Sequence, residues 1–324
     1  MAITARTSPT KKAPPPRQRV GTWRTRRARW DLKLSPYAFI SPFFILFAAF
    51  GLYPLIWTAW MSLHRVELSN PDQMTWLGLK NFTDLLSDSH FWNAFTNTFT
   101  IGVISTVPQL MIALGLAHIL NYKLRGRTFF RIAVLTPYAT SVAASAIVFA
   151  QLFGRDYGFI NWLLSFVGVD NIDFTNSKWP AQIAISVIVI WRWTGYNALI
   201  YLAAMQAIPQ DLYESAALDG ASRWQQFWHV TIPNLRPTIV FTVIVSTIGA
   251  SQLFGEPMLF GGGGSPEQGG ADNQYQTLAM YFFERGFTDQ HLGRAAAVAW
   301  AMFLLIVVFV AINTLLARRA RSAN

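Results

Sequence analysis

The stretch AAAVAWAMFLLIVVFVAINTLL, residues 295–316, contains 22 residues and no charged side chain. A helix of that length rises about 33 Å, which is enough to cross the hydrocarbon core of a bilayer. Because lipid offers no hydrogen-bond partner to a backbone, a segment inside it has to satisfy its own N–H and C=O groups, as a helix does. The stretch therefore predicts a transmembrane helix.

Five further apolar blocks of similar length precede this stretch. They cover residues 37–61, 99–120, 132–153, 183–205 and 238–260. The chain is 52% hydrophobic and 13% charged, whereas a soluble domain carries about 25% charged residues. These observations predict an all-α, polytopic membrane protein with six transmembrane helices. Prolines within or near the blocks are expected to kink them, and these are Pro54, Pro108, Pro137 and Pro257.

Lysine and arginine are distributed unequally between the two sides of the blocks. The side with both termini and the loops 121–131 and 206–236 holds 19 of the 26 basic residues, while the opposite loops hold six. Because positive charge favours the cytoplasmic side, both termini are expected to be cytoplasmic. The expected organisation is a basic N-terminal tail (1–36), a transmembrane domain (37–316) and a C-terminal tail (317–324).

The net charge of +10 comes largely from this N-terminal tail. A basic tail next to a membrane span is typical of contact with anionic lipid, so the lipid bilayer is the expected partner and nucleic acid is not. The chain has no cysteine and its five histidines are scattered. Disulfides and thiol catalysis are therefore excluded, and no metal site is expected.

One polar segment between the fourth and fifth blocks, YESAALDGASRWQQFWHVTIPNLRP (213–237), has the pattern of two short helices. Asp211 with Glu214 three residues later resembles a capping box, and Gly220 is placed to end the first helix. A second helix is expected from Ser222 until Pro233 stops it. The first helix is acidic, which favours docking into a basic protein groove. The alternative is a helix resting on lipid headgroups, which usually carries lysine and arginine.

The same residues resemble the EAA loop of permease subunits in ATP-binding-cassette importers. The family pattern is Glu-Ala-Ala, three residues, Gly, nine residues, Ile, one residue, Leu-Pro. The chain departs from it mildly, at Ser215, Val230 and Ile232. The stretches LYPLIWTAWMSL, GLKNFTDLLSDSHFWNAFTNT and QTLAMYFFERGF are similar to carbohydrate-uptake permeases, in particular to the first permease of maltose importers.

This resemblance implies a transport subunit of the bacterial cytoplasmic membrane, with no catalytic residues of its own. It implies a second, related permease, two copies of a cytoplasmic ATPase that bind ATP and Mg²⁺, and an extracytoplasmic sugar-binding protein. This chain contains no Gly-Lys pair and hence no P-loop, so no cofactor is expected on it. The residues implied in coupling to the ATPase are Glu214, Ser215, Ala216, Ala217, Asp219 and Gly220.

A sugar path is expected where aromatic and amide side chains gather within the spans. The sequences WRWTGYN (191–197) and SQLFGEP (251–257) supply them. The residues predicted to contact a disaccharide or oligosaccharide are Trp193, Tyr196, Asn197, Gln252 and Glu256. Two alternatives stay open: Arg192 and Glu256 pair only to hold helices together, or the aromatic residues belong to an interfacial belt.

Two other functions compete with the importer. A stand-alone, ion-coupled secondary transporter would need internal repeats and several carboxylates at mid-membrane, and the chain offers little beyond Glu256. A membrane enzyme would need converging acid and base residues at one face, which the loop carboxylates do not form in the sequence. The importer permease is therefore the predicted function.

Overall fold

The computed structural model describes the backbone of residues 22–122, 125–261 and 265–322, and the side chains from residue 35 to residue 315 within them. Most of this part of the chain is helical. Residues 1–57 and 58–324 form two units, which are described separately. Of the predicted tails, residues 1–21 and 323–324 lie outside the described residues.

The first unit contains helix α1 (Thr22–Phe47), a π-helical turn (Ala48–Leu52) and the start of α2 (Tyr53–Ser62). Helix α1 begins 15 residues before the predicted first span. The widened turn lies directly before Pro54, whose ring cannot accommodate the carbonyl four residues earlier in regular helix geometry. An apolar span over Ser35–Ser62 is long enough to cross a membrane.

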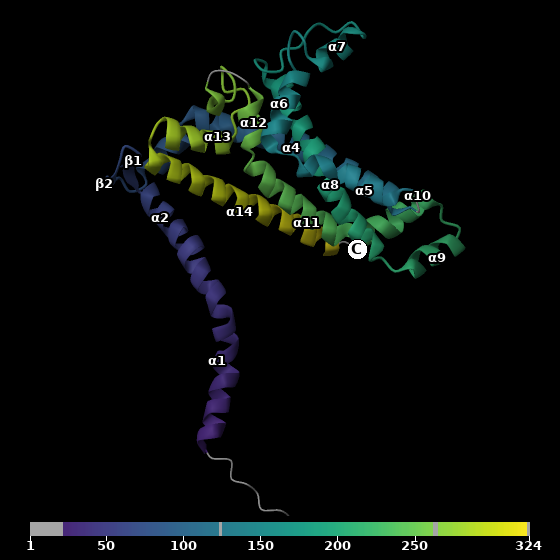
Figure 1. The fold of residues 1–324 in the computed structure, drawn as a ribbon, viewed down its shortest axis with the longest axis horizontal. Helices are drawn as coiled ribbons and strands as arrows, with labels where there is room; N and C mark the ends of the chain where they lie inside the picture. The colour runs from purple at the N-terminus through teal and green to yellow at the C-terminus, as the bar shows by residue number, and fades with distance from the viewer. Residues whose placement is uncertain (1–21, 123–124, 262–264, 323–324) are drawn as a thin grey trace, which may run out of the picture. The chain divides into compact units, whose positions relative to one another are not determined.

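Four long helices form the bundle of the second unit (Figure 1). They are α4 (Ser89–Asn121), α8 (Lys178–Gln206), α11 (Ile232–Ser251) and α14 (Leu292–Ser322). Helices α4 and α8 pack along each other through fully buried small residues, including Ala113 on α4 and Ala198 on α8. Small side chains let membrane helices approach closely, and this contact forms the centre of the bundle.

The predicted third span is broken. Helix α5 (Arg127–Ala139) and helix α6 (Val142–Leu152) meet at 90°. The Thr140 hydroxyl donates to the carbonyl of Pro137 at 2.6 Å and so satisfies one of the groups that the break exposes. Helix α5 packs on α8 at Gly195, where any Cβ atom would overlap the backbone of Val134.

A β-hairpin corrects the prediction of an all-α chain. Strands β1 (His64–Glu67) and β2 (Asn70–Trp76) are antiparallel, with His64 opposite Trp76. The side chain of Asn81 donates to the carbonyls of Ser62 (2.8 Å) and His64 (2.9 Å) and holds the hairpin. These strands are too short to stand out in the sequence, and their pairing depends on this tertiary contact.

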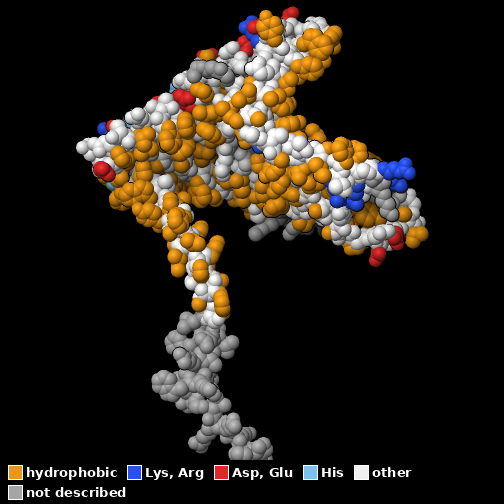
Figure 2. Space-filling model, in the orientation of Figure 1, with side chains coloured by type: hydrophobic (Ala, Val, Ile, Leu, Met, Phe, Trp, Pro, Cys, Tyr) orange, Lys and Arg blue, Asp and Glu red, His pale blue; other side chains and the backbone are white. Residues whose placement is uncertain are grey.

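Short helices lie in the segments that connect the hairpin and the longer helices. They are α3 (Lys80–Ser87), α7 (Phe159–Ser165), α9 (Gln210–Leu218), α10 (Arg223–Gln226), α12 (Gly255–Phe260) and α13 (Leu278–Phe283), with a 3₁₀ turn at Pro266–Gln268 and a π-helical turn at Glu284–Thr288. Hydrophobic side chains cover the sides of the bundle in the view of Figure 2, which is typical of a surface that faces lipid.

Buried amides hold residues 273–277 against the bundle. Gln182 on α8 donates to the Asn97 side chain and to the carbonyl of Gln274, both at 2.9 Å. Asn97 in turn donates to the carbonyl of Asn273 at 2.8 Å. Because each amide is satisfied within a low-dielectric interior, the network gives this end of the bundle a fixed geometry.

A charged cluster beside this network joins α13 to the start of α4. Tyr281 donates to Asp88 at 2.7 Å, and Arg285 contacts the same carboxylate at 3.3 Å. Burial raises the pKa of Asp88, but hydrogen bonds from Tyr281 and His90 and the charge of Arg285 outweigh it and lower this pKa below its usual value. Burial and the bond to Asp88 raise the pKa of Tyr281 to about 12.

These observations confirm a mostly helical, polytopic membrane protein. Among the described residues five helices are long and apolar enough to span a bilayer, and the count is six if the bent α5–α6 pair forms one span.

Candidate functional site

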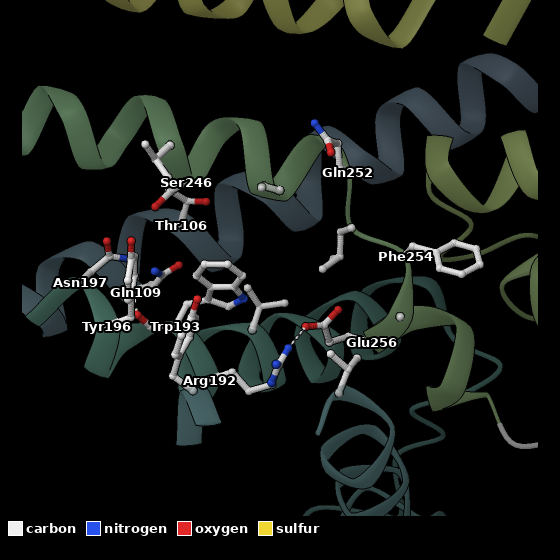
Figure 3. A pocket seen from close by; sticks show the side chains of 18 residues that line it. Thr106, Gln109, Arg192, Trp193, Tyr196, Asn197, Ser246, Gln252, Phe254 and Glu256 are labelled. Carbon is white, nitrogen blue, oxygen red and sulfur yellow. Dashed lines mark hydrogen bonds and ion pairs between the residues drawn. The ribbon is translucent and has the colours of Figure 1, made fainter. Parts of the chain in front are cut away.

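A cavity of about 440 Å³ lies within the bundle (Figure 3). Its walls come from α4, α8, α11, the α5–α6 break and the segment that leads from α11 into α12. The polar and aromatic residues that line it are Thr106, Gln109, Tyr138, Arg192, Trp193, Tyr196, Asn197, Ser246, Gln252, Phe254 and Glu256. A volume of this size is in the range of small-molecule sites.

All five residues predicted for the sugar path line this cavity. Trp193, Tyr196 and Asn197 fall within little more than one turn of α8, so they share one side of that helix. Gln252 and Glu256 come from the segment in which α11 ends and α12 begins. The structure thus brings together two sequence stretches about 60 residues apart.

Four further uncharged polar residues of the lining were not predicted. Thr106 and Gln109 lie on α4, Ser246 lies on α11, and Tyr138 lies near the end of α5. Gln109 follows Pro108 and is the only amide residue in the block 99–120, and a lone amide in a membrane span is the signal that could have identified it.

Three aromatic side chains form one wall of the cavity. The rings of Tyr138 and Tyr196 are stacked with centroids 4.8 Å apart, and Trp193 meets Tyr138 edge to face at 5.3 Å. This packing fixes the orientation of each ring. The exposed parts of such rings can contact the C–H groups of a ligand, while the tyrosine hydroxyl groups can hydrogen bond.

A buried ion pair lies at the edge of the cavity, where Arg192 Nη1 contacts Glu256 Oε1. Arg192 is 7% exposed and Glu256 is 5% exposed. The other terminal nitrogen of Arg192 reaches the carbonyl of Thr140 at the α5–α6 break, at 3.5 Å. The pairing that was left open in the sequence is therefore present. Because these are the only two charged residues among the described residues that line the cavity, its lining is neutral overall.

Two buried donors in the cavity lining have no protein partner. They are Nε2 of Gln109, a residue 2% exposed, and Nε of Arg192. Buried polar groups are almost always hydrogen bonded, either to protein or to bound water or ligand. The other amides and hydroxyls of the lining, such as those of Asn197 and Ser246, suit a molecule that carries hydrogen-bonding oxygen atoms.

A second candidate site is the exposed segment formed by α9 and α10. Glu214, Ser215 and Ala217 are exposed on α9, and Ala216 is half-buried there. Gln210 donates to Glu214 at 3.0 Å. Asp219 and Gly220 follow the helix, and both are exposed. In Figure 2, acidic and basic side chains gather at this end of the bundle.

The predicted turn between α9 and α10 is present. Gly220 has φ of +82°, a conformation that favours glycine. The N–H of Ala221 donates to the carbonyl of Ala216 at 2.9 Å, and that of Gly220 donates to Ala217 at 3.1 Å. These two bonds form a Schellman cap. Ser222 then begins α10 with a full capping box that includes Gln225.

Two local predictions about this segment were wrong. Asp211 lies in the first turn of α9, and Pro209 occupies the cap position without a side-chain hydrogen bond. Pro233 does not stop the second helix, because a π-helical turn (Phe227–Thr231) precedes it and α11 continues from Ile232. The wider turn bonds residues five apart and relieves the clash that proline causes in a regular helix.

The α9–α10 segment is tied to the long helices by specific contacts. The hydroxyls of Tyr213 on α9 and Thr231 are 2.9 Å apart, and Thr231 is buried at the start of α11. The ring of Phe227 lies 4.5 Å from that of His118 on α4, and the guanidinium of Arg223 lies over the Tyr122 ring. These contacts connect the α9–α10 segment to the start of α11 and to the end of α4.

Within the described residues, no three His, Asp or Glu side chains lie close enough together to hold a metal ion.

Comparison with known proteins places these features in context. Residues 109–322 match the family described as binding-protein-dependent transport system inner membrane component. The chain is 34% identical over 278 residues to the arabinooligosaccharides transport system permease protein AraP of Halalkalibacterium halodurans, covering 85% of each chain. It is 33% identical over 273 residues to the trehalose/maltose transport system permease protein MalF of Thermococcus litoralis, covering 84% of this chain and 90% of that protein.

A third relative is the lactose transport system permease protein LacF of Rhizobium radiobacter, 34% identical over 276 residues, covering 84% of this chain and 90% of that protein. Among solved structures, a bacterial ABC transporter involved in the import of the acidic polysaccharide alginate contains a similar chain. The TM-score is 0.75 at 24% identity, and the match covers 92% of this chain and 98% of that one. This likeness shows a shared fold.

Proposed function

The chain belongs to the family of binding-protein-dependent transport system inner membrane components, and from this premise we propose that it forms half of the sugar pathway of an ATP-driven importer. Membership of the family confirms the resemblance to importer permeases on which the sequence interpretation depends. It also indicates a multi-pass protein of the inner membrane.

The observation that carries the proposal is the composition of the cavity. Stacked aromatic side chains, amides and hydroxyls line it. A sugar offers both groups that such a lining can bind, hydroxyl oxygens and C–H-rich ring faces. The relatives AraP, MalF and LacF are named for arabinooligosaccharides, trehalose/maltose and lactose. We therefore infer a disaccharide or oligosaccharide substrate.

The charge of the lining favours an uncharged sugar. Glu256 compensates the charge of Arg192, and the rest of the described lining is neutral. An anionic substrate would lose hydration in this cavity, and the described lining offers no unpaired cation that could compensate its charge.

The orientation of the chain follows from its basic residues. We infer that both termini and the loop 206–236, which contains α9 and α10, face the cytoplasm, because that side carries most of the lysine and arginine. The hairpin, α7 and residues 265–291 then face the outside. Sugar would enter from an external binding protein on that side.

Helix α9 is the proposed contact with the ATPase. It presents an acidic, small-residue surface with Glu214 exposed, which suits a basic cleft in a partner. Two ATPase subunits would bind ATP and Mg²⁺, and their closure would displace α9. The Tyr213–Thr231 contact and the Phe227–His118 contact give that displacement a route to α11 and α4, two walls of the cavity.

Purification with a tag on this chain, in mild detergent and from its native membrane, tests the proposal. We expect one copy of a second permease and two copies of an ATPase to co-purify, and ATP-dependent sugar uptake after reconstitution with the binding protein. A chain that isolates alone and moves sugar down an ion gradient would refute the importer and favour a stand-alone secondary transporter.

A further inference from the structure

The segment between α6 and α8 is held in one conformation by the side chain of Asn161. Asn161 lies on α7 and is 2% exposed. Its amide nitrogen donates to the carbonyls of Gly154 (3.2 Å), Arg155 (3.0 Å) and Ile172 (2.9 Å), and its oxygen accepts from the N–H of Ile172 at 3.0 Å. One amide thus joins both ends of the segment to α7.

The end of the segment before α8 is fixed as well. Asp173 accepts from the backbone N–H groups of Thr175 (3.0 Å) and Asn176 (2.9 Å). Hydrogen bonds, chiefly from Asn176, keep the pKa of Asp173 well below its usual range. The neighbouring Phe174 is buried and meets the ring of Phe153 at 4.9 Å. The loop is therefore part of the folded core at both ends.

This ordered segment nevertheless exposes a large apolar surface, which we call the α7 face. Its members are all exposed: Tyr157, Phe159, Trp162, Leu163, Phe166 and Val167. The Trp162 ring stacks on Phe159 at 5.5 Å and meets Phe166 edge to face at 4.8 Å. Figure 2 shows hydrophobic side chains on the lobe where Figure 1 labels α7. An exposed patch of this kind marks a surface that something covers.

The position of the segment in the chain indicates that the lipid bilayer covers the α7 face. It starts directly after α6, the second half of the bent α5–α6 pair, and ends where the span of α8 begins. With α5–α6 taken as one span, both ends of the segment lie near the same surface of the bilayer. The exposed apolar surface also continues onto α6, where Ile147 and Val148 are more than half exposed.

The chemistry of the α7 face fits the boundary between headgroups and acyl chains. Tryptophan and tyrosine are enriched at that depth, where an apolar ring and a polar tip are both satisfied. We propose that the α7 face is inserted into the outer leaflet of the bilayer and anchors the α6–α8 connection there. Between residues 154 and 177 the sequence contains one base, Arg155, and three acids, Asp156, Asp170 and Asp173. Apolar burial, without attraction to anionic lipid, therefore holds the face in place.

The absence of cysteine from the chain makes this inference directly testable. A nitroxide label is placed at Phe166→Cys, and its collisions with oxygen and with a water-soluble nickel chelate are measured in nanodiscs of phosphatidylcholine. Two controls calibrate the scale: Asp170→Cys, exposed in the same loop, and Val308→Cys, exposed on the apolar span of α14. A second label at Val167→Cys guards against a local effect at position 166.

We expect oxygen to exceed nickel severalfold at positions 166 and 167, as at position 308, and the reverse at position 170. The same ratio is expected when anionic lipid is added to the nanodisc. Higher access to nickel at both 166 and 167 would overturn the proposal. A second result would also overturn the proposal: nickel reaches the labels in the isolated chain, but neither reagent reaches them in the purified complex. In that case a protein, and not lipid, would cover the α7 face. A depth that depends on anionic lipid would contradict anchoring by apolar burial. None of these measurements requires a functioning importer.

Discussion

Removing one partner of the Arg192–Glu256 pair should destabilise the protein much more than removing both. In Glu256→Leu, the guanidinium keeps only the distant carbonyl of Thr140 as an acceptor, at 3.5 Å. Breaking a buried pair costs about 3–5 kcal/mol. Because Arg192 lines a cavity that water can enter, we expect the lower end, about 3 kcal/mol of unfolding free energy.

The reciprocal variant should be milder. In Arg192→Met, the buried Glu256 carboxylate can take up a proton and become neutral, which a guanidinium cannot do. In the double variant no unpaired charge remains, and replacing a buried pair by apolar residues of similar size is often neutral or stabilising. We therefore expect Glu256→Leu to be the least stable of the three and the double variant to be close to the wild type.

Equilibrium unfolding of the purified chain in mixed micelles, followed by tryptophan fluorescence, measures the cycle. Ser246→Ala is a matched control, because Ser246 lines the same cavity without a charge, and its effect should stay within about 0.5 kcal/mol. Additive effects of the two single substitutions would refute the reasoning, since they would mean that the charges do not depend on each other.

Three further results are expected. Glu214→Lys on the exposed α9 should reduce ATP-driven uptake to background with unchanged amounts of protein in the membrane; normal uptake would exclude its role in docking. Trp193→Ala should raise the sugar concentration for half-maximal uptake about 2- to 12-fold, since an aromatic contact contributes about 0.5–1.5 kcal/mol, while an unchanged value would remove Trp193 from the path. Folding lowers the pKa of Asp88, so its ionised carboxylate stabilises the folded protein fully at pH values above the ordinary aspartate pKa. This contribution is lost as the pH falls through the lowered pKa of the folded protein. Thermal unfolding of Asp88→Asn should therefore lose part of the acid dependence that the wild type shows, and identical pH profiles would contradict this.

Part of the site could be predicted from the sequence because its signals are local. Ser222 lies two residues after Gly220, so one turn contains both a left-handed cap and a new capping box. The stretch WRWTGYN is a cluster of polar and aromatic residues within a helix, and four of its side chains line the cavity. Residues within one or two helical turns decide the geometry of this turn, and they also place the WRWTGYN side chains close together on α8.

The remaining features depend on contacts between distant residues. The packing of α4 along α8 decides that Gln109 lines the cavity, and the Arg192–Glu256 pair joins residues 64 apart. The β-hairpin needs the side chain of Asn81. Pro233 was expected to end a helix, and the π-helical turn that carries the helix through it cannot be read from residue preferences.

The sequence by itself determined that this is a helical membrane protein with a polar segment of two short helices, because lipid forces apolar runs to form helices and capping residues act locally. Only the tertiary structure decided where the third span bends, which side chains face the cavity and which charges compensate each other. Those outcomes depend on how the surfaces of the helices fit together. The sequence pattern specifies which face of a helix is apolar, but it does not specify which other helix packs against that face.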